Sequence, residues 1–126
     1  MKILLDTNFL LIPSQFKVDI FSEIERIVQD SYKIYILEQT IDELNNIFEK
    51  QKGKNKDAAK LALQLIKQKD LNTIKNSQKG IVDDIILDIV DNTYIVATQD
   101  KELKNKLKDK KIKTITLRAK KYLVMN

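Results

Sequence analysis

The sequence predicts an α/β fold, a three-layer sandwich whose central, mainly parallel sheet of four to five strands carries helices on both faces. Short apolar runs, typical of buried strands, alternate with segments whose apolar residues recur every three or four positions, as on amphipathic helices. This alternation is the pattern of parallel α/β sheets. The 126 residues show no internal repeat and no linker rich in proline or serine, so we expect a single domain, residues 1–126.

The first three elements follow from apolar spacing. Residues 2–6 are apolar between Lys2 and Asp6, as strands buried on both faces are. Residues 18–28 carry apolar side chains at helical spacing and predict a helix. The run 33–37 is dominated by isoleucine, tyrosine and leucine, and it predicts the second strand.

The middle of the chain is predicted to be largely helical. Residues 41–48 and residues 58–66 both carry apolar side chains at helical spacing. The polar segment 51–57 between them contains a glycine and indicates a break. A weak strand at 71–75 and a loop at 76–80 are expected to follow.

The last third predicts two helices and two strands. Residues 82–90 and 101–108 have helical spacing, and the run 93–98 between them predicts a strong strand. Residues 112–117 alternate between apolar and polar, as a half-buried or edge strand does. The phenylalanines are expected in the core or in an interface; they are Phe9, Phe16, Phe21 and Phe48.

The composition excludes several classes of enzyme. Histidine and cysteine are absent, which excludes serine–histidine–aspartate triads, HExxH zinc sites and thiolate metal sites. The two glycines, Gly53 and Gly80, lie outside the predicted strand-to-helix turns, so a Walker A loop or a GxGxxG turn is excluded as well. The same lack of a glycine-rich turn disfavours a receiver-like or nucleotide-binding protein with a doubly wound sheet. Carboxylates, lysines, hydroxyls and a metal they could hold remain for chemistry.

Location and charge give weaker indications. No apolar stretch is long enough to span a bilayer and no signal-peptide pattern follows Met1, so we expect a cytoplasmic protein with no membrane partner. The formal net charge of +5 suits a polyanionic partner, although such a charge is also common in proteins that have none.

Five carboxylates lie where the predicted topology brings strand ends together. Asp6 ends the first strand, Asp100 follows the strong strand, and Glu43 lies in the first turn of the helix after the second strand. Asp83 and Asp84 open the helix that precedes the strong strand. Because open parallel sheets bind ligands at the carboxyl ends of their strands, these acids are candidates to converge at one site.

Each acid also has a structural interpretation. Asp6 could form an Asx-turn, and Glu43 could close a capping box that begins at Thr40. The pair at 83–84 and Asp100 could cap helices. Caps tolerate serine, threonine or asparagine, however, whereas every one of these positions carries a carboxylate. Crowded carboxylates repel one another unless a cation intervenes, and oxygen ligands alone select Mg²⁺ or Mn²⁺, which can activate water against a phosphodiester.

Four acidic motifs, in order along nearly the whole chain, resemble those of PIN-domain ribonucleases. They are Asp6-Thr7-Asn8, Glu43-Leu44, Asp83-Asp84-Ile-Ile-Leu and Thr98-Gln-Asp100. The resemblance is strongest to the Fcf1/Utp24-like branch, which is linked to ribosomal RNA processing, and the antitoxin-paired VapC toxins share the domain. It implies a PIN-like sandwich and a divalent-metal-dependent endoribonuclease.

The resemblance also implies roles for individual residues. The implied ligands of Mg²⁺ or Mn²⁺ are Asp6, Glu43, one or both of Asp83 and Asp84, and Asp100. The hydroxyl of Thr98 is expected to hold this site, and Asn8 to support it. Helical spacing favours Asp83 as the principal ligand, since Ile86 and Val90 share its face, with Asp84 as a secondary ligand or water holder.

RNA is the expected partner. Lys101 and Lys104 follow Asp100 closely and are predicted RNA contacts, because phosphate contacts supply most of the sequence-independent affinity. A solvated helix face is the alternative. A homodimer, a ribosome-assembly factor and an antitoxin are further partners left open. Two other functions also stay open: a catalytically silent RNA-binding or scaffold domain, and a toxin-type ribonuclease held by an antitoxin.

Overall fold

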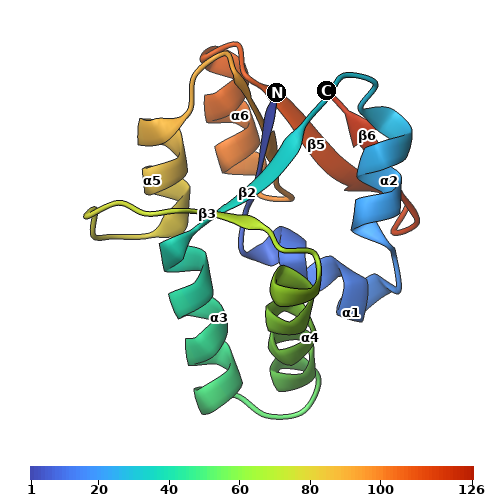
Figure 1. Cartoon of the computed structure of the whole chain (residues 1–126), viewed down its shortest axis with the longest axis vertical. Coiled ribbons are helices and arrows are strands. Elements are labelled where there is room, and N and C mark those ends of the chain that lie inside the picture. Colours follow the sequence, from blue (N-terminus) through green and yellow to red (C-terminus); the bar gives the residue numbers. More distant parts are fainter.

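A six-stranded sheet forms the centre of the molecule in a computed structural model that describes all 126 residues. The strand order is β3-β2-β1-β4-β5-β6. The strands are β1 (Lys2–Leu5), β2 (Lys33–Leu37), β3 (Asn72–Ile74), β4 (Tyr94–Ala97), β5 (Lys113–Arg118) and β6 (Tyr122–Met125). Neighbours from β3 to β5 pair in parallel, and β6 pairs antiparallel with β5. The predicted mainly parallel sheet is confirmed (Figure 1).

Helices cover both faces of this sheet and complete the three layers. They are the 3-10 helix η1 (Asn8–Leu11) and the α-helices α1 (Ile12–Phe16), α2 (Ile20–Ile27), α3 (Glu38–Lys50), α4 (Lys54–Gln68), α5 (Val82–Ile89) and α6 (Lys101–Asp109). Because side chains alternate along a strand, β1 faces two separate cores. Ile3 and Leu5 pack with η1 to α4, and Leu4 packs with α5 and α6.

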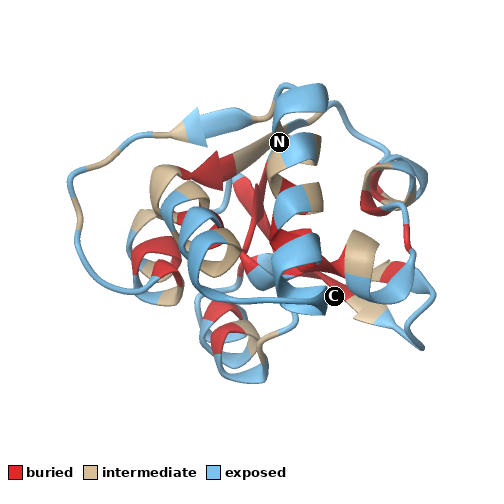
Figure 2. Cartoon of the chain, turned by 90° about the horizontal axis from the view of Figure 1, so that it is seen from below, coloured by how far each residue is buried: buried red, intermediate tan, exposed pale blue.

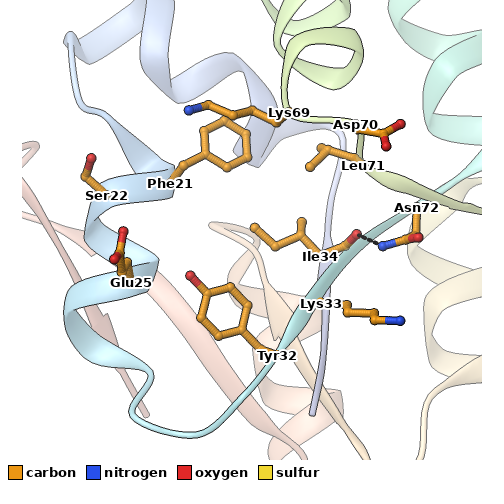
Figure 3. A pocket seen from close by; sticks show the side chains of 10 residues that line it. All are labelled: Phe21, Ser22, Glu25, Tyr32, Lys33, Ile34, Lys69, Asp70, Leu71 and Asn72. Carbon is orange, nitrogen blue, oxygen red and sulfur yellow. Dashed lines mark hydrogen bonds between the residues drawn. The ribbon is translucent and has the colours of Figure 1, made fainter.

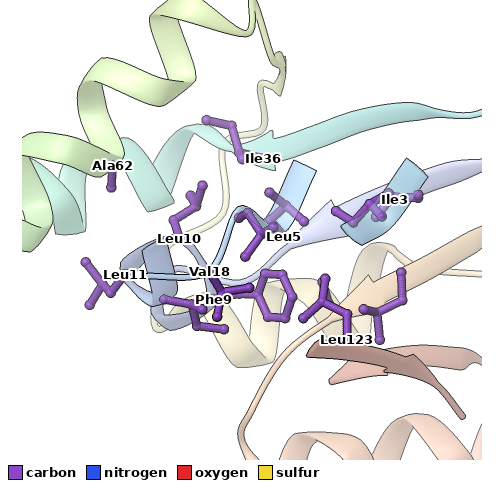
Figure 4. Close-up of a cluster of buried hydrophobic side chains, with 14 of the residues drawn as sticks. Ile3, Leu5, Phe9, Leu10, Leu11, Val18, Ile36, Ala62 and Leu123 are labelled. Atoms are coloured by element: carbon purple, nitrogen blue, oxygen red, sulfur yellow. The ribbon is translucent and has the colours of Figure 1, made fainter. Parts of the chain in front are cut away.

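Figure 2 shows buried residues concentrated on the strands and on the inner sides of the helices. The larger core is drawn in Figure 4, where Phe9 of η1 lies among side chains from β1 and β6. Phe21 and Phe48 pack against this core while partly exposed, as expected. Phe16 is 36% exposed and lies outside the core, so an interface position stays a prediction for this residue. None of the helices combines the length and the apolar composition that a membrane span requires.

Three features of the fold differ from the prediction. The sheet has six strands rather than four to five, because a three-residue turn at 119–121 reverses the chain and adds β6. Residues 8–16 form η1 and α1, for which no helix was predicted. Helix α3 begins at Glu38, directly after β2, and not near residue 41. The starts of these helices and of β6 were not predicted, because polar residues or a turn without glycine mark them.

Candidate active site

The carboxyl ends of the two central strands bring Asp6 and Thr98 together. Asp6 follows β1 and Thr98 follows β4, and the Asp6 N–H donates to the Ala97 carbonyl at 3.0 Å, so the pairing of β1 and β4 extends to the site. Asp6 is 2% exposed and Thr98 is fully buried. The Thr98 hydroxyl donates to Oδ2 of Asp6 at 2.9 Å. This bond, rather than the Asx-turn considered above, fixes the Asp6 side chain.

Thr98 also positions Asp100. Its hydroxyl oxygen accepts the Asp100 N–H at 3.1 Å, and Oδ1 of Asp100 accepts the Leu103 N–H at 2.9 Å. Asp100 is therefore the N-cap of α6, as its structural interpretation predicted. One hydroxyl thus orients two carboxylates that come from different motifs.

Glu43 is held by two threonines that were not predicted as site residues. Since α3 begins at Glu38, Thr40 lies inside the helix, the capping box is wrong, and Glu43 is in the second turn. The Thr7 hydroxyl lies 2.5 Å from Oε1 of Glu43 and 3.1 Å from the Thr40 hydroxyl. A hydroxyl has one proton, so Thr7 donates to the carboxylate and Thr40 donates to Thr7. Thr7 and Thr40 are buried, and this could have been predicted only if the first residue of α3 had been known.

Asp83 and Asp84 lie in the first turn of α5, and neither caps it, since the N-cap is Ile81 and no side chain bonds there. Burial and repulsion from Asp6 and Asp100 raise the pKa of Asp83 from its ordinary 3.8 to about 6, with a smaller contribution from Glu43. These charges act on Asp83 because the side chains lie close together. Asp84, by contrast, is exposed, and it is not among the groups that shift the Asp83 pKa.

Asp6 shows the same crowding. Burial raises its pKa above the usual range, the Thr98 hydroxyl opposes this shift, and Glu43 and Asp100 add to it. Four acids from four separate motifs, Asp6, Glu43, Asp83 and Asp100, therefore share one electrostatic environment. Their donor atoms are all oxygens, which fits a hard divalent cation. No three acidic side chains already surround one point at ligand distances, so a cation would have to draw them together.

The other predicted residues lie near this site in differing degrees. Lys101 is exposed and Lys104 is half-buried, both in the first turns of α6, which Asp100 caps. Asn8 is exposed, and its side chain makes no hydrogen bond to the acids. A separate pocket of about 300 Å³ lies at the amino end of β2, beside Phe21, Tyr32 and Lys69 (Figure 3). It lies at the amino ends of the strands, whereas the acids lie at the carboxyl ends.

Comparison with known families and proteins identifies relatives of this chain. A family model described as a PIN like domain matches residues 3–120. Ribonuclease VapC4 of Methanocaldococcus jannaschii is 38% identical over 125 residues, covering 96% of this chain and 93% of that protein.

Two solved structures share the architecture. The PIN domain endonuclease Utp24 superposes with a TM-score of 0.80 at 21% identity, covering 99% of this chain and 90% of that one. A domain of a functionally unknown protein from Methanocaldococcus jannaschii gives a TM-score of 0.60 at 18% identity, with 94% and 91% covered. At such identities the likeness establishes the fold alone.

Proposed function

Since the chain belongs to the PIN like domain family, we propose that it is an endoribonuclease that uses Mg²⁺ or Mn²⁺ to hydrolyse RNA phosphodiester bonds. The predicted resemblance to that family is confirmed. The observation that carries the proposal is the gathering of four acids where β1 and β4 end. Asp6 and Asp100 share the Thr98 hydroxyl, and repulsion from Asp6, Asp100 and Glu43 adds to burial in raising the pKa of Asp83. The name of the 38% identical relative, a ribonuclease, supports RNA as the substrate.

In this proposal the four acids hold the metal, with Asp83 as the ligand of the 83–84 pair and the exposed Asp84 as a holder of bound water. A divalent ion at such a site supplies an activated water and neutralises charge on the scissile phosphate. The chain contributes orientation. Thr98 keeps Asp6 and Asp100 in place, and the Thr7–Thr40 pair keeps Glu43 in place.

The Asp83 carboxyl has a further part in the proposal. Its pKa of about 6 means that this carboxyl is half protonated near pH 6 and mostly charged at pH 7. A cation that neutralises the neighbouring acids removes the repulsion that favours the proton. Asp83 would thus release its proton when metal binds, so metal affinity should rise with pH.

The test is cleavage of RNA by purified Asp6→Asn and Asp100→Asn variants with Mn²⁺. Each should be slower by about 10²–10³-fold, because metal catalysis is worth several kcal/mol. Asp109→Asn, at the exposed far end of α6, is the matched control and should cleave like the wild type. Undiminished activity in both site variants would overturn the mechanism.

A thermal measurement tests the metal independently of activity. Mn²⁺ should raise the melting temperature of the wild type by mass action, and the rise should shrink in Asp6→Asn but not in Asp109→Asn. A protein that binds RNA and never cleaves it with Mn²⁺ would instead support the silent RNA-binding or scaffold alternative.

The 38% identity to Ribonuclease VapC4 favours a second, finer proposal, that this is a toxin-type ribonuclease held by an antitoxin. Induced expression of the wild type alone should then arrest growth of a bacterial host, while Asp6→Asn should not. Ribosomal RNA processing with an assembly factor is the competing assignment. It predicts normal growth on expression and accumulation of precursor RNA when the gene is removed.

A further inference from the structure

Beside α6, one face of β5 carries polar side chains where the other face carries the apolar core. Along β5, Ile115 packs into the core on one face, so the alternate residues Thr114 and Thr116 lie on the other. That second face adjoins a groove of about 420 Å³, which is lined chiefly by Lys104, Lys108, Thr114, Thr116, Arg118 and Asn126. Thr114 and Thr116 are only 5% and 6% exposed, so the groove combines two buried threonines with the exposed cations Lys108 and Arg118.

The charge of this groove is positive and uncompensated. The two salt bridges of the molecule join Arg26 to Glu23 and Lys106 to Glu102, so the groove cations take part in neither. None of the lining residues is acidic. The Thr116 hydroxyl accepts a hydrogen bond from the Asn126 amide at 3.1 Å, whereas no side chain bonds the Thr114 hydroxyl. Exposed cations with no acidic neighbour in the groove suit a phosphate-bearing polyanion.

The groove starts at the edge of the sheet that carries the acids. Asp100 caps α6, and Lys101, Lys104 and Lys108 follow at positions that share one face of this helix. Arg118 ends β5, which runs parallel to β4, so it lies at the same edge as Asp100. Lys108 is about 12 Å along the helix from Asp100. A chain lying in the groove would therefore pass away from the acids.

We propose that the groove between α6 and the β5–β6 hairpin binds the phosphodiester backbone of the RNA substrate beyond the nucleotide that is cut. This rests on the proposed ribonuclease function and extends it from the cut bond to the strand around it. The contacts are to phosphates, so the groove adds affinity without base preference.

The experiment compares two double charge reversals. Lys108→Glu with Arg118→Glu changes the groove, and Lys60→Glu with Lys67→Glu makes the same charge change on exposed positions of α4, which packs on the opposite face of the sheet. Binding of a fluorescein-labelled single-stranded RNA is measured by anisotropy in EDTA at several salt concentrations. Single-turnover cleavage with Mn²⁺ follows, and melting temperatures check that each variant folds.

The groove variant should bind RNA about tenfold or more weakly than the wild type. The slope of log affinity against log salt concentration should be smaller by about 1.4, because two phosphate contacts of roughly 0.7 each are lost. The control should change affinity by less than about twofold. At saturating RNA the cleavage rate of the groove variant should match that of the wild type, because the acids are untouched.

If the groove variant and the control bind RNA with equal affinity while the wild type cleaves it, the groove does not bind the RNA backbone. The ribonuclease proposal is unaffected by that result. Wild type that neither binds nor cleaves RNA would overturn both. If the groove variant instead loses binding to polyglutamate while keeping its RNA affinity, the groove serves an acidic protein segment and the RNA proposal is wrong.

Discussion

Asp6 and Asp83 belong to the same group of acids but are held in opposite ways. Asp6 is 2% exposed, and its side chain accepts a hydrogen bond from the buried Thr98. Asp83 is half-exposed in the first turn of α5, and burial and its charged neighbours raise its pKa to about 6. The fold thus orients the first acid in advance, while the charge of the second depends on what binds beside it.

Removing the hydroxyl that orients Asp6 should have the largest effect. In Thr98→Val the buried Asp6 loses the hydroxyl that donates to it and the Asp100 N–H loses its acceptor. Leaving buried polar groups unpaired should lower the free energy of unfolding by about 2–3 kcal/mol. Cleavage should fall by about 10–100-fold, as when the supports of metal ligands are removed.

Urea denaturation and single-turnover cleavage measure these two effects. Thr73→Val is the matched control, because Thr73 is exposed in β3 and its hydroxyl has no side-chain partner. If Thr98→Val is as stable and as active as this control, the orientation of Asp6 does not depend on Thr98.

Asp83→Asn should act in the opposite direction on stability. It removes a charge that its neighbours repel, so the metal-free protein should become more stable by about 1–2 kcal/mol, allowing for solvent screening at this half-exposed position. The stabilisation by Mn²⁺ should shrink at the same time. Asp84→Asn is the control, and melting temperatures with EDTA and with Mn²⁺ are the measurement. An equal gain in stability in both variants would contradict the distinction between the two acids.

Glu43 is intermediate between Asp6 and Asp83, because it is half-exposed but accepts a hydrogen bond from Thr7. Thr7→Val removes this bond and leaves the Thr40 hydroxyl without its partner, which should cost about 1 kcal/mol of stability. Cleavage should fall about tenfold and recover in Thr7→Ser, which keeps the hydroxyl. A variant Thr7→Ser no more active than Thr7→Val would show that shape, not the hydrogen bond, matters here.

The pH dependence of the metal-free protein should show the smallest effect. The folded pKa of Asp83, about 6, lies above its ordinary 3.8, so the folded chain binds the proton more tightly than the unfolded chain between these values. Stability should therefore fall, by about 1 kcal/mol, as pH rises from about 4 to about 6. Urea denaturation in EDTA at several pH values measures this slope. It should become shallower in Asp83→Asn, where the raised pKa of Asp6 still contributes, and persist in Asp84→Asn.

Much of the fold could be predicted because the spacing of apolar residues indicates which face of a strand or helix is buried. The runs at 2–6, 33–37 and 93–98 gave β1, β2 and β4 within a residue or two. The hairpin to β6 was not predictable in this way. Ala119 and Lys120 both adopt left-handed backbone angles, φ 55° and 56°, in a turn that normally carries asparagine and glycine. Tertiary pairing with β5 overrides that local preference.

The site shows the same division between the linear pattern and the folded chain. The order of acids and the parallel topology were enough to predict that Asp6, Glu43, Asp83 and Asp100 gather at one edge of the sheet. The spacing on α5 also predicted that Asp83, not Asp84, faces the protein, and Asp83 is the half-buried one. The roles of Thr7 and Thr40 escaped prediction, because Thr40 resembles an N-cap until the start of α3 is known.

Residue identity and apolar periodicity are local properties, so the available chemistry and the ends of the strands could be predicted from the sequence. How each acid is held follows from contacts between distant parts of the chain. A hydroxyl 92 positions away fixes Asp6, and charges from three other motifs raise the pKa of Asp83. Hydrogen bonds and Coulomb interactions depend on distances in space, and folding alone sets those distances.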